Sequence, residues 1–134
     1  MGSFSDYTEL KELDHLVGKT TFALPTCYVG LSTADPLDTG AGLAEPVGNG
    51  YARVQTAGGD WNAAAAGANS NGNDIEFPEA TGAWGTITHF ALFDAAAAGN
   101  MLSHSILTLE KVIGNGDTAK FAGGTPGELV NTLD

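Results

Sequence analysis

The sequence is poor in cysteine, in basic residues and in long apolar runs. Its single cysteine, Cys27, excludes an internal disulfide framework, and we interpret it as a small core residue. Only 5 lysines and arginines stand against 16 aspartates and glutamates, which gives a formal net charge of −11. Phosphate backbones and anionic membranes attract the opposite charge, so we expect neither nucleic acid nor membrane as a partner. The N-terminus lacks the features of a signal peptide, and no apolar run reaches membrane-spanning length, so we expect synthesis in the host cytoplasm.

The chain of 134 residues suits one domain, residues 1–134, which we expect to be organised around a central β-hairpin. The first arm, residues 84–94, is rich in aromatic and β-branched residues and is apolar on both faces, which predicts a strand buried on both sides. A turn around residues 95–100 joins it to the second arm, residues 101–109. There the alternation predicts one buried and one exposed face.

Further short strands are expected over residues 20–31, 51–56, 75–78, 110–113, 118–121 and 128–133, separated by Gly-, Pro- and Asn-rich turns. Two long loops, residues 32–50 and 57–74, lie between them. The predicted fold class is therefore mainly β. We expect a single antiparallel β-sandwich or jelly-roll-like domain with one N-terminal α-helix and a β-rich body over residues 20–133.

The helix is predicted over residues 6–17, where Leu10, Leu13 and Val17 form an apolar stripe widened by Tyr7 and Leu16. Asp6 and Glu9 have capping-box spacing, with Ser5 as a rival cap, and Gly18 is a natural stop. Two interpretations remain open: the helix covers one end of the β-domain, which we favour slightly, or it is an arm that docks on a neighbouring subunit.

The residues suited to chemistry do not form a catalytic constellation in the sequence. His89 and His104 are expected to lie opposite or diagonal to each other in the hairpin, where ordinary sheet histidines are a better interpretation than a metal pair. Two oxygen-rich groups are best interpreted as solvated turns, since neither follows a calcium-loop pattern; they are Asp35, Asp38 and Glu45, and Asn71, Asn73, Asp74 and Glu76. Arg53 could pair with buried acids. We therefore expect no enzyme activity, cofactor or metal.

Five segments, taken in order, resemble a family of small tailed-bacteriophage virion proteins. Members are commonly labelled tail fibre protein, and some look like capsid decoration (cement) proteins. The segments are SDYTELKELDHLVG (5–18), YVGLSTADP (28–36), GYAR (50–53), IEFP (75–78) and WGTITHFALFD (84–94). The resemblance implies a structural role in the virion and no catalytic residues. Long fibres need repeats or coiled coils, and the chain has neither.

Three hypotheses follow from the resemblance and the residues. The first is a decoration protein on the capsid surface that binds the major capsid protein, acts as a homo-oligomer with a trimer favoured, and stabilises the shell. The second is a tail fibre, collar or adaptor protein that binds tail proteins or a receptor. The third is a small carbohydrate- or metal-binding enzyme domain that uses Trp61, His89 and His104. The contact candidates lie in the helix region and in the first long loop: Phe4, Tyr7, Leu10, Leu13, Asp35, Leu37, Asp38, Leu43 and Val47.

Overall fold

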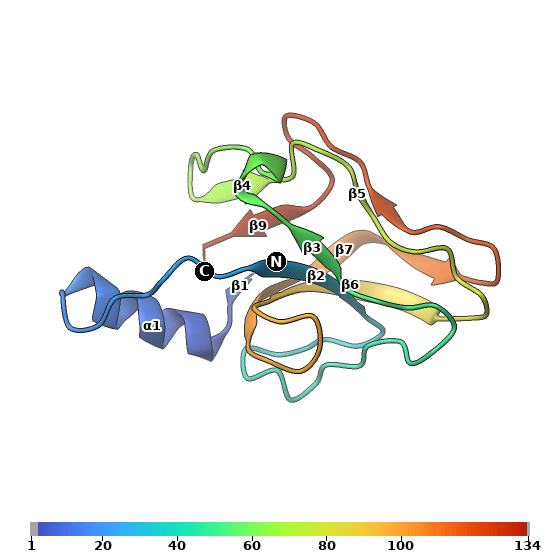
Figure 1. Ribbon diagram of the computed structural model, residues 1–134, viewed down its shortest axis with the longest axis horizontal. Coiled ribbons are helices and arrows are strands. Elements are labelled where there is room, and N and C mark those ends of the chain that lie inside the picture. The colour runs from blue at the N-terminus through green and yellow to red at the C-terminus, as the bar shows by residue number, and fades with distance from the viewer. Residues whose placement is uncertain (1–2, 134) are drawn as a thin grey trace.

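The computed structural model describes residues 3–133, and these residues form a mainly β structure with one helix, as predicted. Figure 1 shows α1 projecting from one end of a β-rich body. The elements in chain order are β1 (Ser3–Phe4), α1 (Asp6–Leu16), β2 (Cys27–Ser32), β3 (Val54–Thr56), the 3-10 helix η1 (Gly58–Asp60), β4 (Ala68–Ser70), β5 (Ile75–Glu76), β6 (Gly85–Phe93), β7 (Met101–Ile113), β8 (Lys120–Phe121) and β9 (Val130–Thr132).

The largest sheet has five antiparallel strands in the order β1-β7-β6-β2-β3. Its centre is the predicted hairpin, β6 and β7, which is confirmed. Two smaller antiparallel ribbons, β4-β9 and β5-β8, complete the strands. Each ribbon joins segments about 45 to 65 residues apart in the chain, for example Ile75 with Phe121 and Ser70 with Val130. Such distant pairings close the body around one core.

The core lies between the large sheet and the two ribbons. Side chains at alternate positions of β2 and β6 point into it, among them Val29, Leu31, Phe90 and Leu92. Phe121 of β8 meets the ring of Phe90 edge to face, with 5.8 Å between centroids. The remaining buried members of the cluster are Ile75, Phe77, Ala80, Trp84, Ile87, Leu102, Ile113 and Leu129.

The other face of the sheet is covered by the long loop that follows β2. Leu43 of this loop packs on a second small cluster of Ala91, Phe93 and Met101. Residues 90–93 of β6 are therefore buried on both faces, which confirms the prediction for that half of the strand. Residues 85–89 are less enclosed; of these five, only Ile87 is buried.

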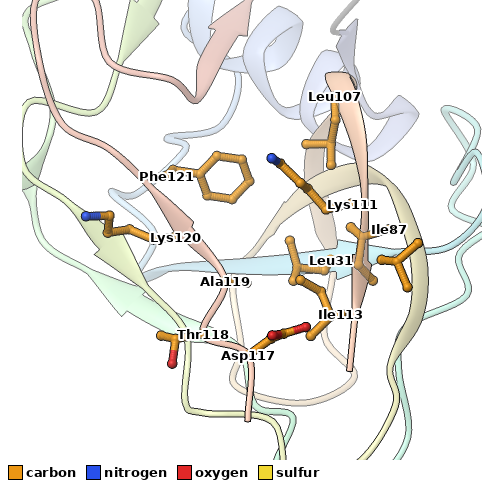
Figure 2. Close-up of a pocket in the computed structure, with 11 residues that line it drawn as sticks. Leu31, Ile87, Leu107, Lys111, Ile113, Asp117, Thr118, Ala119, Lys120 and Phe121 are labelled. Atoms are coloured by element: carbon orange, nitrogen blue, oxygen red, sulfur yellow. The ribbon is translucent and has the colours of Figure 1, made fainter. Parts of the chain in front are cut away.

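The prediction of one buried and one exposed face for the second arm is wrong. Residues 101–105 of β7 are all buried, and residues 106–112 are exposed apart from the half-buried Leu107. The pairing of β6 with β7 changes register between the pairs His89–Ile106 and Ile87–Lys111. One residue of β6 lies between these two pairs, whereas β7 has four there, residues 107–110. Residues 107–110 therefore bulge out of the ladder before pairing resumes at Lys111. A groove of about 440 Å³ opens between β7 and β8 (Figure 2).

Several predicted strands are shorter than expected. The first begins at Cys27 rather than at residue 20, because residues 20–26 form no ladder and Pro25 has no backbone donor to contribute. The strands expected over residues 51–56, 75–78, 118–121 and 128–133 contain two or three paired residues each. The 57–74 loop contains β4, and the start of the chain contains β1; neither strand was predicted.

Candidate docking surfaces

The helix α1 presents its apolar stripe to solvent. Leu10 and Leu13 are 66% and 60% exposed, and Leu16 and Val17 are still more exposed. The body side of α1 is made instead by Thr8, which is buried, and by Tyr7, which packs against Phe22. The slightly favoured interpretation, that the helix covers one end of the β-domain, therefore holds for Thr8 and Tyr7 and fails for the stripe. Figure 1 shows α1 projecting from one end of the body, and we call residues 6–17 the α1 arm.

Local interactions fix where the arm begins and ends. Ser5, the rival cap, is the N-cap: its Oγ accepts a hydrogen bond from the backbone N–H of Thr8 and donates one to the carbonyl of Met101 in β7. At the other end Gly18 adopts a φ of +77°, and Lys19 donates its N–H to the carbonyl of Asp14. The arm thus leaves the sheet beside Met101 and stops at the predicted glycine.

The loop candidates lie over the face of the sheet that carries His89, Ala91 and His104. Asp35, Leu37 and Asp38 are exposed, and Val47 is 93% exposed. Leu43 is half-buried because it covers the second cluster. The structure also joins the loop to the start of the chain, because the N–H of Asp6 donates to the carbonyl of Asp38. Phe4 and Tyr7 are half-buried, so they offer less free surface than Leu10 and Leu13.

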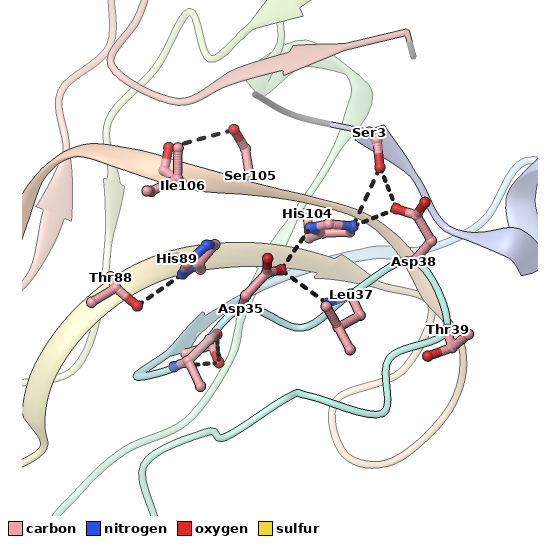
Figure 3. Close-up of polar contacts among 12 residues, drawn as sticks. Ser3, Asp35, Leu37, Asp38, Thr39, Thr88, His89, His104, Ser105 and Ile106 are labelled. Carbon is pink, nitrogen blue, oxygen red and sulfur yellow. Dashed lines mark hydrogen bonds and ion pairs between the residues drawn. The ribbon is translucent and has the colours of Figure 1, made fainter.

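A polar cluster forms where the loop meets β1 and β7 (Figure 3). His104 Nε2 lies 2.8 Å from Asp38 Oδ1 and 3.3 Å from Ser3 Oγ, and its Nδ1 lies 3.8 Å from Asp35 Oδ1. Ser3 Oγ donates to the same Asp38 oxygen. The hydrogen bond from Ser3, followed by that from His104, holds the pKa of Asp38 below its usual value.

The cluster is arranged to position the loop. In a nucleophilic triad the serine donates to the histidine, and the far histidine nitrogen donates to a carboxylate. Here Asp38 lies at Nε2 of His104, the nitrogen that would have to accept the proton of Ser3. Ser3 donates its hydrogen bond to Asp38 instead. Residues 3–133 contain no group of three His, Cys, Asp or Glu side chains placed to hold a metal ion.

The third hypothesis requires residues that the fold separates. Ala91 pairs with His104 and Ile106 pairs with His89, so the two histidines are diagonal neighbours on the loop-covered face, as predicted. Trp61 packs against the core on the other side of the sheet, and its Nε1 donates to Thr56. The structure therefore does not bring Trp61 together with His89 and His104.

A second polar network, centred on Arg53, holds the loop in place. The Arg53 guanidinium pairs with both carboxylate oxygens of Glu45, at 2.9 and 2.7 Å. It also donates to the carbonyls of Ala95 and Ala98, and its Cζ lies 3.5 Å from the ring centroid of Phe93. The predicted pairing of Arg53 with an acid is confirmed, although Glu45 is half-buried rather than buried. Glu45 is only 19% exposed, so its assignment to a solvated turn is wrong.

The second oxygen-rich group also contains a buried member. Asn71 is 0% exposed, so the solvated-turn interpretation is wrong for it. Asn73, Asp74 and Glu76 are exposed, in keeping with that interpretation. A buried amide in a Gly- and Asn-rich stretch has no separate sequence signal, because its partners lie about 50 residues further along the chain.

Acidification is expected to lower the thermal unfolding midpoint between pH 7.5 and 5. Burial, opposed by Asp35 and reinforced by His104, lowers the pKa of His89 below its value of about 6.5 in an unfolded chain. The unfolded state therefore binds a proton first, and the stability contributed by neutral His89 is lost as pH falls through this range. Differential scanning fluorimetry across the range should show a shallower pH slope for His89→Gln. Equal slopes for the two proteins would refute this role of His89.

No helix within residues 3–133 is both long and apolar enough to span a membrane. A comparison with curated proteins gives no significant match. The family model described as "Podophage GP4 fiber I protein gp80" matches residues 3–126, which is nearly the whole chain. The match includes both candidate docking surfaces, the α1 arm and the loop after β2.

Proposed function

The chain belongs to the podophage GP4 fibre I protein gp80 family, a family of fibre-type structural proteins of the phage virion, and we propose that it works in the tail as a fibre, collar or adaptor protein for host attachment. The family match over residues 3–126 is the observation that carries this proposal. Its partners would be other tail proteins or a receptor, with no role for nucleic acid or membrane. A net charge of −11 supports both exclusions.

The structure supports a binding role that uses exposed surface. The α1 arm places Leu10, Leu13, Leu16 and Val17 in solvent, and such a cluster marks a protein contact more often than a chance exposure. The loop after β2 is anchored to the body by Arg53 and His104, so it keeps one shape while Leu37 and Val47 stay exposed. A rigid surface loses less conformational entropy on binding. We propose that the protein is not an enzyme.

Capsid decoration is the second candidate. A short acidic β-body with a projecting arm suits a knob that bridges capsid subunits, and in that case the partner would be the major capsid protein at the capsid surface. The fibre description of the family favours the tail over this alternative. A homotrimer is compatible with both candidates and is proposed for both.

Quantitative mass spectrometry of virions separated into heads and tails tests the two candidates. We expect the protein in the tail fraction, in a copy number that is a small multiple of the tail symmetry. Removing the gene should then abolish adsorption and leave the shell stable. Hundreds of copies in the head fraction, with a shell that becomes heat-labile on removal, would reject the tail proposal and establish decoration.

A further inference from the structure

We propose that the α1 arm of one copy docks in the groove between β7 and β8 of a second copy of the same chain. The two surfaces are exposed, apolar and unlike each other, so the contact is head to tail. The proposal concerns self-assembly and holds for either location in the virion.

The arm has the pattern of a helix that lies in a groove. Leu10, Leu13 and Val17 are spaced i, i+3 and i+7, so they share one face, and that face points away from the body. Glu9 is four residues before Leu13, and Asp14 is four residues after Leu10, so the two acids border the stripe. The arm therefore presents an apolar stripe with negative edges.

The groove has the complementary character. Leu31 and Ile87, 2% and 1% exposed, lie deepest in it, and Leu107, Ile113 and Phe121 also line it. Figure 2 shows the walls coming from two segments, one of them carrying Lys111 and the other Lys120.

The charge of the groove also matches the arm. Lys120 pairs with Asp74 at 3.5 Å, whereas Lys111 has no ion-pair partner among residues 3–133. In a chain with 5 basic and 16 acidic residues, an exposed, unpaired lysine beside an apolar groove is a rare feature. Its natural counterpart is an acidic apolar segment, and α1 supplies one. Asp117 also lines the groove, but its carboxylate accepts a hydrogen bond from the N–H of Gly114 in the adjoining turn.

The arm cannot reach the groove of its own chain. β1, which leads into α1, pairs with Ser103 and His104 near the start of β7, whereas the groove lies along its last residues, 107–113. Figure 1 shows α1 at one end of the long axis and the end of β7 toward the other. Docking must therefore join two copies, and repeated head-to-tail contacts close into a ring when the rotation allows it. A ring of three would give the proposed trimer.

Site-specific photo-crosslinking of the full-length protein tests the contact directly. A photoreactive phenylalanine analogue is placed at position 13. Because Leu13 is 60% exposed, this substitution should leave the fold of the β-rich body unchanged. Irradiating a mixture of ¹⁴N- and ¹⁵N-labelled protein and mapping the crosslinked peptides should give mixed-isotope pairs between position 13 and residues 107–121. Crosslinks between two arms, or only to other segments, would overturn the proposal.

Charge reversal tests the electrostatic part. Lys111→Glu and Leu13→Asp should each raise the dissociation constant of the oligomer at least tenfold, measured by analytical ultracentrifugation. The variant Leu24→Asp, at a 98% exposed position outside the α1 arm, the loop after β2 and the groove, should match the wild type. Combining Lys111→Glu with Glu9→Lys and Asp14→Lys should restore assembly. A wild-type monomer at 100 μM, or a triple variant no better than Lys111→Glu alone, would overturn the proposal.

Discussion

Replacing Arg53 with alanine is expected to lower the free energy of unfolding by about 3–5 kcal/mol, the usual cost of removing one partner from a buried ion pair. The Arg53 side chain is 4% exposed, and four of its hydrogen bonds join Glu45 to the 95–98 turn. Without it, the half-buried Glu45 carboxylate keeps the hydrogen bond from the hydroxyl of Tyr51, at 2.7 Å. Urea unfolding followed by tryptophan fluorescence measures the loss.

A double-mutant cycle separates the charge pair from the packing of the arginine stem. Arg53→Met keeps the aliphatic stem but loses the guanidinium that stacks on Phe93 and strands the charge of Glu45, so it should cost nearly as much as alanine. Adding Glu45→Gln removes that charge and should recover part of the lost stability. If the changes in the free energy of unfolding caused by Arg53→Met and Glu45→Gln simply add, the ion pair itself contributes nothing to stability.

The central hairpin was predictable because its signals are local. The β-branched and aromatic run of β6, the Ala- and Gly-rich turn and the alternation that begins β7 are all read within about 30 residues. The arm was predictable for the same reason: Ser5 and Gly18 bound it with local hydrogen bonds. The direction of its apolar stripe was not, because helical spacing identifies a face but says nothing of whether the body or the solvent lies beside it.

The remaining strands and both polar networks depend on long-range pairing. The two-residue strands β5 and β8 are too short to show a periodic pattern. They form because they pair with each other, although they lie about 45 residues apart in the chain. Arg53 was identified as a candidate for pairing, but its partner was not, since Glu45 lay in a loop assigned to solvent. Strand pairing and buried polar contacts at such separations have no signature in a single sequence.

Replacing Gly127 with alanine is expected to destabilise the protein by more than about 3 kcal/mol, since overpacking and broken hydrogen bonds combine there. A Cβ at this position would lie 1.9 Å from the backbone oxygen of Asn71 and 2.3 Å from its Oδ1. Asn71 is the hub of the segment 121–129: its Nδ2 donates to the carbonyls of Phe121 and Ala122, and its Oδ1 accepts from the N–H of Leu129. To relieve this overlap, the backbone at Gly127 or at Asn71 must move, and either movement breaks the hydrogen bonds of Asn71.

Gly59 provides the matched control for Gly127. A Cβ there meets nothing within 4 Å, and its φ is not in the left-handed region, so Gly59→Ala should change the free energy of unfolding by less than about 1 kcal/mol. Chemical denaturation of both variants beside the wild type makes the comparison. Asn71→Leu, close in size, should be as damaging as Gly127→Ala, because three carbonyls and one N–H each lose a hydrogen bond to the Asn71 side chain. A Gly127→Ala variant as stable as Gly59→Ala would mean that the Asn71 hub does not hold residues 121–129 in place.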